Sequence, residues 1–230
     1  MERWEPQSPE KTQIEEPSVR SSAGVDVEQR LRELERLATE DDLTGLKNRR
    51  YVREFCRQIL DYAENENGHV TLLVYDIDNF KHYNDQYGHA TGDRILKEAA
   101  TLMRRCCRGH DVIARIGGDE FAVVFWDDPP REHSAGQSER RVSGSDHPED
   151  ALFIAQRFQW ALEQSDLGGL GPSGKGVLTI SGGLARYPTD ATSVDELFEK
   201  ADMALLEAKR SGKNRITLVG KPPENTVSGD

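Results

Sequence analysis

The chain has 230 residues and a formal net charge of −11. This length fits one domain of ordinary size with extensions, because most domains have about 100–200 residues. The acidic balance argues against a broad basic surface for duplex DNA, so any anion must be bound at a local basic site. No apolar run approaches the roughly 18 residues of a membrane helix, and the first residues lack the apolar centre of a signal peptide. We therefore expect a cytoplasmic protein that binds neither a membrane nor a nucleic acid polymer.

The sequence contains three cysteines, Cys56, Cys106 and Cys107. Their number is odd and no C-x-x-C spacing is present, which argues against a disulfide framework or a zinc site. We expect these thiols to pack as small apolar groups in helices.

The N-terminal region divides into a polar tail and a short helix. Residues 1–24 are polar, acidic and interspersed with proline and serine, which predicts disorder. From Val27 to Ala38 apolar residues recur at steps of four and three, the stripe of an amphipathic helix over residues 25–40. This helix either pairs with a second copy of itself, as a dimerisation and signalling element, or packs only on its own domain.

Two further segments are expected to lack regular structure. Residues 127–148 are rich in proline, serine, glycine and charge, which predicts a long mobile loop inserted in the domain. Residues 218–230 are expected to form a disordered C-terminal tail. The N-terminal tail and the inserted loop are candidate contacts for an unknown protein partner.

Helix and strand patterns alternate through residues 41–217, the expected catalytic domain. A turn-like stretch with Gly45 precedes a helix with apolar residues on one face. The pattern then predicts a strand at 69–78, a helix at 93–107, a hairpin of strands at 111–116 and 121–126, a helix at 150–164, a strand at 176–187, a helix at 194–211 and a strand at 214–219. This order indicates an α/β (α+β) fold with helices against one largely antiparallel sheet.

Acidic residues stand at the ends of two expected strands. Side chains alternate along a strand, so Asp76 and Asp78 lie on one face at the end of "LLVYDID". The Gly117–Gly118 turn, which we expect to need a positive φ, puts Asp119 and Glu120 at the start of the next strand. If the two strands are neighbours, the acids converge. Carboxylates that converge repel one another unless a cation lies between them, and Mg²⁺ prefers oxygen ligands.

The stretch "RIGGDEF" resembles the signature of the GGDEF family, the diguanylate cyclases, which condense two GTP into cyclic di-GMP and release two pyrophosphates. The resemblance covers about residues 37–217. Its other blocks occur in the family's order: "DDLTGLKNRR", "DIDNFKHYNDQYGHATGD", "RGHDVIARIGGDEF", "SGGLARYPTD" and "ADMALLEAKRSGKNR". It implies a palm-like nucleotidyl cyclase fold, in agreement with the element order above.

The resemblance also implies a metal site and catalytic residues. Asp76, the carbonyl of Ile77, Asp119 and Glu120 match the family's ligands for two Mg²⁺ or Mn²⁺ ions in each active site. Asp119 or Glu120 could also accept the proton of the attacking 3′-hydroxyl, and the sequence leaves this choice open. Lys81 matches a basic residue that contacts phosphate.

Further positions match the family's substrate contacts. Asn84 and Asp93 correspond to the residues that read guanine, because an amide and a carboxylate suit the hydrogen-bonding edge of that base. Gly117 and Gly118 leave room for a triphosphate to approach the backbone. The basic residues Lys209 and Lys213 match phosphate contacts, and their i, i+4 spacing predicts one helical face. One departure from the family lies nearby: Leu206 stands where Tyr is common.

Two ion-pairing sites flank the signature. "RGHD", with Arg108 and Asp111, resembles the family's RxxD site, at which the cyclic di-GMP product binds and inhibits. We also expect Asp42 to pair with Arg115, which would couple the helix at 25–40 to the domain.

Two functions follow from these observations. The first is a metal-dependent cyclase that acts as a homodimer, because each domain holds one GTP and two domains must face each other to close the ring. The second is a non-catalytic receptor for cyclic di-GMP or GTP that signals through protein contacts. The complete acidic set favours the enzyme.

Overall fold

The computed structural model describes residues 22–126, 147–165 and 178–220. The chain divides into a first unit, Met1–Ala38, and a second unit, Thr39–Asp230. The described part of the first unit belongs to helix α1 (Ser22–Thr39). The predicted helix is therefore present, and its large apolar side chains are 51–62% exposed: Val27, Leu31, Leu34 and Leu37.

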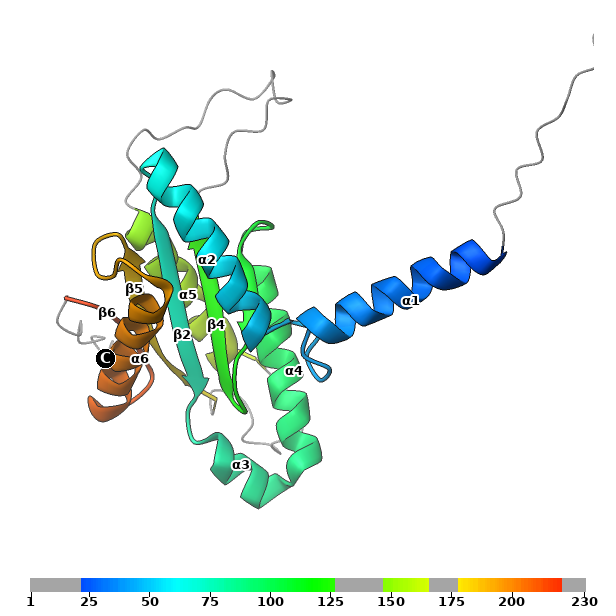
Figure 1. Ribbon diagram of the computed structural model, residues 1–230. Helices are drawn as coiled ribbons and strands as arrows, with labels where there is room; N and C mark the ends of the chain where they lie inside the picture. Colours follow the sequence, from blue (N-terminus) through cyan, green and yellow to red (C-terminus); the bar gives the residue numbers. More distant parts are fainter. Residues whose placement is uncertain (1–21, 127–146, 166–177, 221–230) are drawn as a thin grey trace, which may run out of the picture. The chain divides into compact units, whose positions relative to one another are not determined.

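The second unit is built on a mixed sheet (Figure 1). Its strands in spatial order are β1 (Lys47–Asn48), β3 (Val112–Arg115), β4 (Glu120–Trp126), β2 (Val70–Ile77), β5 (Ile180–Tyr187) and β6 (Arg215–Leu218). The four inner strands pair antiparallel. Strands β1 and β6 pair parallel with their neighbours at the two edges. The expectation of a largely antiparallel sheet is therefore confirmed for its centre.

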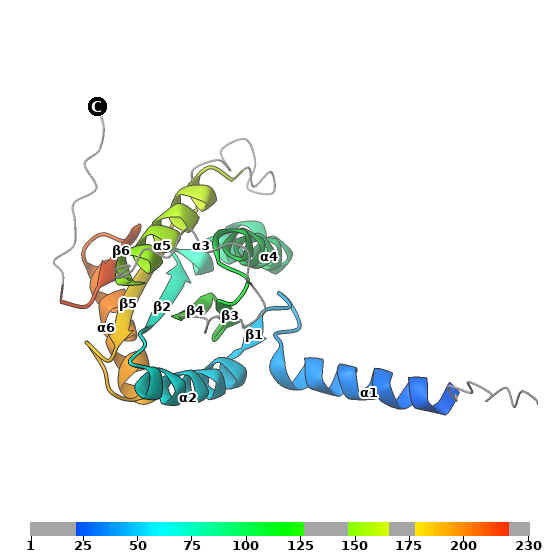
Figure 2. The same cartoon turned by 90° about the horizontal axis from the view of Figure 1, so that it is seen from above.

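Helices cover both faces of the sheet, as Figure 2 shows. On one face lie α2 (Arg49–Glu66) and α6 (Val194–Arg210), and on the other α4 (His89–Cys106) and α5 (His147–Glu163). The short helix α3 (Phe80–Tyr87) connects β2 to α4. Two apolar cores, one on each face, hold the layers together. This arrangement confirms the expected fold class.

Strand β2 is the centre of both cores, and all eight of its residues are buried. Leu73 and Tyr75 point into the core under α4 and α5, whereas Leu72 and Val74 point into the core under α2 and α6. The next side chain on the α2 and α6 face is that of Asp76. A strand that is apolar on both faces thus ends in a carboxylate.

Several bounds differ from the expectations. Helix α3 and strand β1 were not predicted, because α3 buries only Tyr83 and β1 has two residues. Helix α4 begins at His89, four residues before the expected start, and α1 begins at Ser22. Helix α5 begins at His147, inside the segment predicted as a loop.

Leu218, expected at the start of the disordered C-terminal tail, instead ends β6 and is buried. Residues 1–21, 127–146 and 221–230 of the predicted tails and loop lie outside the described residues. Within the described ranges, no helix combines the length and apolar character that a bilayer span requires.

All three cysteines are free thiols. Cys56 in α2 and Cys106 in α4 pack in helices, as expected, whereas Cys107 is the C-cap residue after α4. Cys56 and Cys106 are buried. Burial raises the pKa of Cys56 to about 12, so this thiol stays protonated at neutral pH.

Candidate active site

The acidic cluster lies where β2 ends and β4 begins. Asp76 on β2 is the cross-strand neighbour of Glu120 on β4 and of Ser181 on β5. Directly opposed residues of antiparallel strands share a face, so the Asp76 and Glu120 side chains project on the same side. The Ile77 N–H donates to the Asp119 carbonyl at 3.3 Å, which ties the two segments together. The predicted convergence of these acids is therefore present.

The Asp76 carboxylate is held in an environment that disfavours its charge. Its side chain is 12% exposed, and its Oδ2 lies 2.9 Å from Lys209 Nζ. Burial raises the pKa of Asp76 to about 6, the Lys209 hydrogen bond opposes this shift, and the charges of Asp119 and Glu120 add to it. A site with three such acids and one nearby lysine favours an added cation.

Of the three lysines predicted to contact phosphate, Lys209 reaches the acidic cluster. Lys209 belongs to the last turn of α6. Lys213 lies beyond that helix, with a φ of 62°, and its Nζ donates to Asn79 Oδ1 at 2.6 Å. The prediction that Lys209 and Lys213 share a helical face is wrong, because α6 ends at Arg210. Lys81 is exposed in the first turn of α3.

The expectation that the glycine pair needs a positive φ is wrong. Neither Gly117 nor Gly118 has a positive φ, so the turn does not need glycine for that reason. A Cβ on Gly117 would lie 2.6 Å from Glu120 Oε2, so this glycine leaves room for the glutamate carboxylate. The Gly118 carbonyl accepts from Arg115 Nη2 at 2.7 Å.

The two predicted guanine-reading residues belong to the consecutive helices α3 and α4. A Cβ on Gly92 would lie 1.9 Å from Asn84 Oδ1, so the Asn84 side chain packs directly on the Gly92 backbone. Asp93 follows on α4 and is exposed. Asp93 is the fifth residue of that helix and not its start. Asn84 on α3 thus contacts the residue that precedes Asp93 on α4.

Asp78 does not belong to the acidic cluster. It is 2% exposed. Its carboxylate accepts from Ser181 Oγ and Thr179 Oγ1, each at 2.7 Å, and from the Asn214 N–H at 3.0 Å. These bonds tie β2 to β5 and β6, so Asp78 has a structural role. The prediction that it shares the exposed acidic edge is wrong.

The RxxD residues are engaged within the protein. The Arg108 N–H donates to Asp111 Oδ2 at 2.7 Å, which closes a turn. The Arg108 guanidinium pairs with Asp150 of α5, with Nη2 2.8 Å from Oδ2, and both side chains are nearly half exposed. The arginine is therefore accessible, but it has a protein partner that the sequence did not indicate.

The predicted ion pair of Arg115 is shifted by one residue. Arg115 Nη1 lies 3.2 Å from each carboxylate oxygen of Asp41, not of Asp42. Asp41 also accepts from the N–H of Thr44 at 2.8 Å. Arg115 therefore connects the turn that precedes β1 to the Gly118 carbonyl of the hairpin.

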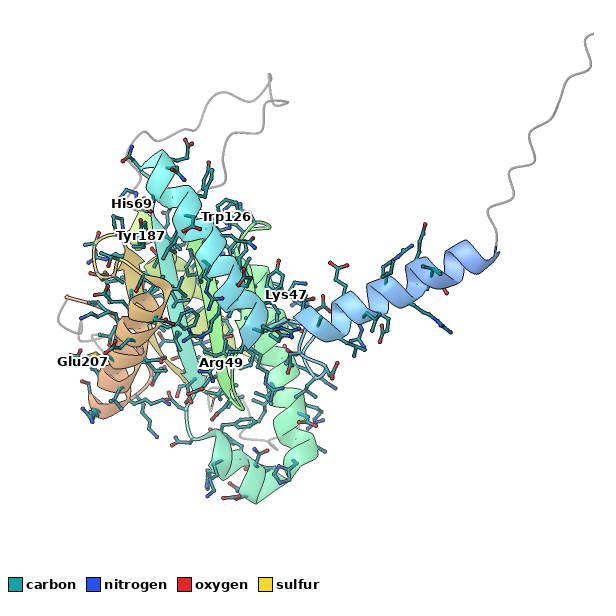
Figure 3. All side chains as sticks on the ribbon, viewed as in Figure 1. Lys47, Arg49, His69, Trp126, Tyr187 and Glu207 are labelled. Carbon is teal, nitrogen blue, oxygen red and sulfur yellow. The ribbon has the colours of Figure 1, made fainter. Side chains whose placement is uncertain are left out.

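A pocket of about 290 Å³ opens beside Glu120 on the α2 and α6 face. Its polar lining consists of Arg49, Arg53, Glu120, Asp202 and Lys209. Burial and the charge of Glu120 raise the pKa of Asp202, and the positive charges of Arg49, Arg53 and Lys209 oppose part of this shift. The sequence predicts no role for Arg49, Arg53 or Asp202, although Arg49 lies in the block "DDLTGLKNRR" and Asp202 in the block "ADMALLEAKRSGKNR". Figure 3 labels Arg49 at the start of α2.

The carboxylates of the acidic cluster suit divalent cations that are also bound by the phosphates of a nucleotide. Among residues 22–126, 147–165 and 178–220, no group of three or more His, Cys, Asp or Glu side chains is arranged to hold a metal ion unaided. Mg²⁺ usually binds one or two protein carboxylates and completes its shell with water and substrate phosphates. Asp76, Asp119 and Glu120 supply such carboxylates.

Comparison with known proteins identifies the family. Residues 38–149 match the family described as "Diguanylate cyclase, GGDEF domain". The GGDEF domain of YfiN from Pseudomonas aeruginosa is 31% identical, with a TM-score of 0.64 over 78% of this chain and 99% of that domain. The chain belongs to the GGDEF family.

Two further GGDEF proteins are similar to the chain. Diguanylate cyclase DgcS of Shewanella oneidensis is 36% identical over 179 residues, which is 77% of this chain and 52% of that protein. The coiled coil and GGDEF domain of DgcB from Caulobacter crescentus, solved with c-di-GMP, is 27% identical. That structure has a TM-score of 0.69 and aligns over 85% of this chain and 94% of its own. The chain spans about half the length of the curated relatives it matches.

Proposed function

We propose that the chain is a diguanylate cyclase that condenses two GTP into cyclic di-GMP with release of two pyrophosphates. The observation that carries this proposal is the meeting of Asp76 with Asp119 and Glu120 at two strand ends, beside Lys209. Membership of the GGDEF family supports it. We place the reaction in the cytoplasm, where GTP is available.

In each half-reaction, the 3′-oxygen of one GTP forms a bond to the α-phosphorus of the other. The bond from that phosphorus to the pyrophosphate oxygen breaks, and pyrophosphate leaves with the electron pair. Asp119 or Glu120 accepts the hydroxyl proton. Asp76, the Ile77 carbonyl, Asp119 and Glu120 would hold two Mg²⁺ or Mn²⁺ ions, which supply charge neutralisation and activate the hydroxyl. Lys81, Lys209 and Lys213 balance phosphate charge.

Selection of guanine is assigned to Asn84 and Asp93. The contact of Asn84 with Gly92, the residue before Asp93, supports this assignment. A carboxylate can accept from the N1–H and amine of guanine, and an amide can donate to its carbonyl. Adenine lacks this pattern of donors and acceptors. Gly117 and Gly118 keep the approach to the backbone open.

The reaction requires two copies of the domain, because each copy holds one GTP. The exposed apolar face of α1 supports its role as the pairing helix. We further propose product inhibition at Arg108 and Asp111, where Arg108 is accessible for a phosphate or a guanine edge.

The experiment is incubation of the purified chain with GTP and Mg²⁺ over a range of protein concentrations, with products resolved by chromatography and mass. We expect cyclic di-GMP, with a rate per protomer that rises with concentration. Asp119→Ala should abolish the product, whereas Asp61→Ala, which changes an exposed acid on α2, should not.

The alternative is a receptor that binds cyclic di-GMP or GTP without turnover. Arg108, with its near half-exposed side chain, is the feature that favours it. Absence of product at every protein concentration, together with cyclic di-GMP binding that Arg108→Ala removes, would establish the receptor and reject the cyclase.

A further inference from the structure

The pocket beside Glu120 has an apolar wall and a charged rim. Its wall consists of Ile116 and of α6 residues, namely Phe198, Leu205 and Leu206. Its rim carries the cations Arg49, Arg53 and Lys209 and the acids Glu120 and Asp202. An apolar wall beside clustered cations suits a ligand that has both a ring and an anionic group, such as a nucleotide.

The three cations differ in how they are used inside the protein. Arg53 pairs with Asp195 at 2.7 Å and lies over the Phe198 ring at 4.6 Å. Lys209 pairs with Asp76 at 2.9 Å. For Arg49, no hydrogen bond or ion pair is found within the described ranges, and Asp202 is the carboxylate whose charge it affects. Arg49 is therefore the cation most available to a ligand.

The pocket and the proposed guanine site are formed by elements that pack on opposite faces of the sheet. The guanine-reading residues are at the α3–α4 corner, and Lys213 reaches the loop that precedes α3. The pocket lies between α2 and α6 on the opposite face of the sheet, and Glu120 contributes to it. A nucleotide held from the α3–α4 side therefore leaves this side of Glu120 open.

We propose that this pocket receives the ribose and α-phosphate of the GTP presented by a second copy of the chain, and that Arg49 binds that phosphate. The inference rests on the proposed cyclase function and assigns a binding site to the GTP that the second copy presents. The incoming GTP must bring its 3′-oxygen to the acidic cluster, and its α-phosphate is attached to the same ribose. A cation beside Glu120 is thus placed to orient the attacking nucleotide, which makes Arg49 a substrate-binding residue in trans.

The experiment uses 3′-deoxy-GTP, which lacks the attacking hydroxyl and cannot react. The full chain and its Arg49→Ala variant are titrated with this analogue and Mg²⁺. Calorimetry measures the dissociation constant for each protomer, and sedimentation measures the dimer dissociation constant with and without the analogue. We expect the analogue to tighten the native dimer by about tenfold and the variant dimer by less than about twofold. The dissociation constant of the analogue for a single protomer should differ by less than about twofold between the native chain and Arg49→Ala.

Two variants make the comparison specific. Arg50→Ala removes the adjacent, exposed arginine, which does not line the pocket, and should behave like the native chain. Leu206→Trp adds volume at the pocket wall without removing charge, and should also abolish the tightening. Unfolding midpoints of all variants establish that they fold.

The outcomes separate this inference from the proposed function. If Arg49→Ala weakens binding to a single protomer as much as it weakens the dimer, Arg49 serves the resident nucleotide and the inference is overturned. It is also overturned if neither constant changes. If the native chain makes no cyclic di-GMP but the analogue tightens its dimer through Arg49, the cyclase proposal fails and the pocket stands.

Discussion

Two aspartates at the end of the same strand have opposite environments. Asp78 is buried and accepts three hydrogen bonds from Ser181, Thr179 and the Asn214 backbone. Asp76, two residues earlier, has one lysine partner, and burial raises its pKa to about 6 while Asp119 and Glu120 add to the shift. An aspartate thus stabilises the packing of the strands at position 78, whereas at position 76 it belongs to a cluster with more acids than bases.

The different environments of Asp76 and Asp78 show that one aspartate stabilises the fold and the other contributes to the candidate site. A carboxylate whose lone pairs are satisfied inside the protein adds to stability, because its desolvation is offset by hydrogen bonds. A carboxylate that faces other acids costs stability and is retained where a ligand supplies the missing charge. Asp78 holds β2 against β5 and β6, and this rigid frame positions Asp76.

The largest effect is expected from Asp76→Asn, which removes the charge and keeps the shape. Product formation should fall by at least about 1000-fold, because the proposed metal site loses a ligand. In EDTA at pH 7.5, the free energy of unfolding should rise by about 1–2 kcal/mol, because a buried, unbalanced charge is removed. Chromatography and urea unfolding measure the two effects. An active variant, or one that unfolds more easily, would contradict this assignment.

Asp78→Asn should lower the free energy of unfolding, whereas Asp76→Asn should raise it. An amide nitrogen in place of one carboxylate oxygen would face a donor, so we expect a loss of about 2–4 kcal/mol in the free energy of unfolding. Ser181→Ala, which removes one of the donors, should cost less, about 1–2 kcal/mol. Urea unfolding of the three chains gives the ranking. Equal stability of Asp78→Asn and the native chain would remove the contrast between the two aspartates.

The sequence predicts the acidic site better than it predicts this contrast. The apolar run of β2 and the glycine turn before β4 are local signals that place the acids at two strand ends. Their convergence was predicted only if the two strands are neighbours, and the pairing of β2 with β4 meets this condition. The partners of Asp78 lie 101 to 136 residues away in the chain. No local pattern distinguishes a carboxylate that will meet two hydroxyls from one that will meet two acids.

The same limit explains the other errors. Helix α3 buries one side chain, so its apolar period is too weak to recognise. The pocket joins Arg49 at the start of α2 to Asp202 on α6, and only the packing of both helices on one face of the sheet brings them together. The position of Lys213 depends on where α6 ends, which sequence patterns place only to within a few residues.

The pH dependence of stability sharpens the comparison at Asp76. Its pKa is about 6 in the folded chain, against a model-peptide value of 3.8. Below pH 3.8 the carboxyl is protonated in both states and carries no penalty. As the pH rises to about 6, the unfolded chain loses the proton first, so stability falls, and above that value the penalty is constant.

The corresponding measurement is urea unfolding of the native chain and Asp76→Asn from pH 4 to 8 in EDTA. The stability advantage of the variant should grow by about 1–2 kcal/mol between pH 4 and pH 6 and stay level above. Subtraction of the two curves removes the titration of all other groups. An advantage that does not change with pH would show that Asp76 is ionised throughout.

The smallest effect is expected at Asp150, a third kind of carboxylate that is exposed and has a single charged partner. It pairs with Arg108 at 2.8 Å, so a product bound at the proposed RxxD site must compete with it. Exposed ion pairs contribute about 0–1 kcal/mol, so Asp150→Asn should lower the inhibitory concentration of cyclic di-GMP by about two- to fivefold. Initial rates with added product measure this change, and the uninhibited rate should stay the same. Arg108→Ala should instead remove inhibition, and a higher inhibitory concentration in Asp150→Asn would mean that Asp150 helps to bind the product and does not compete with it.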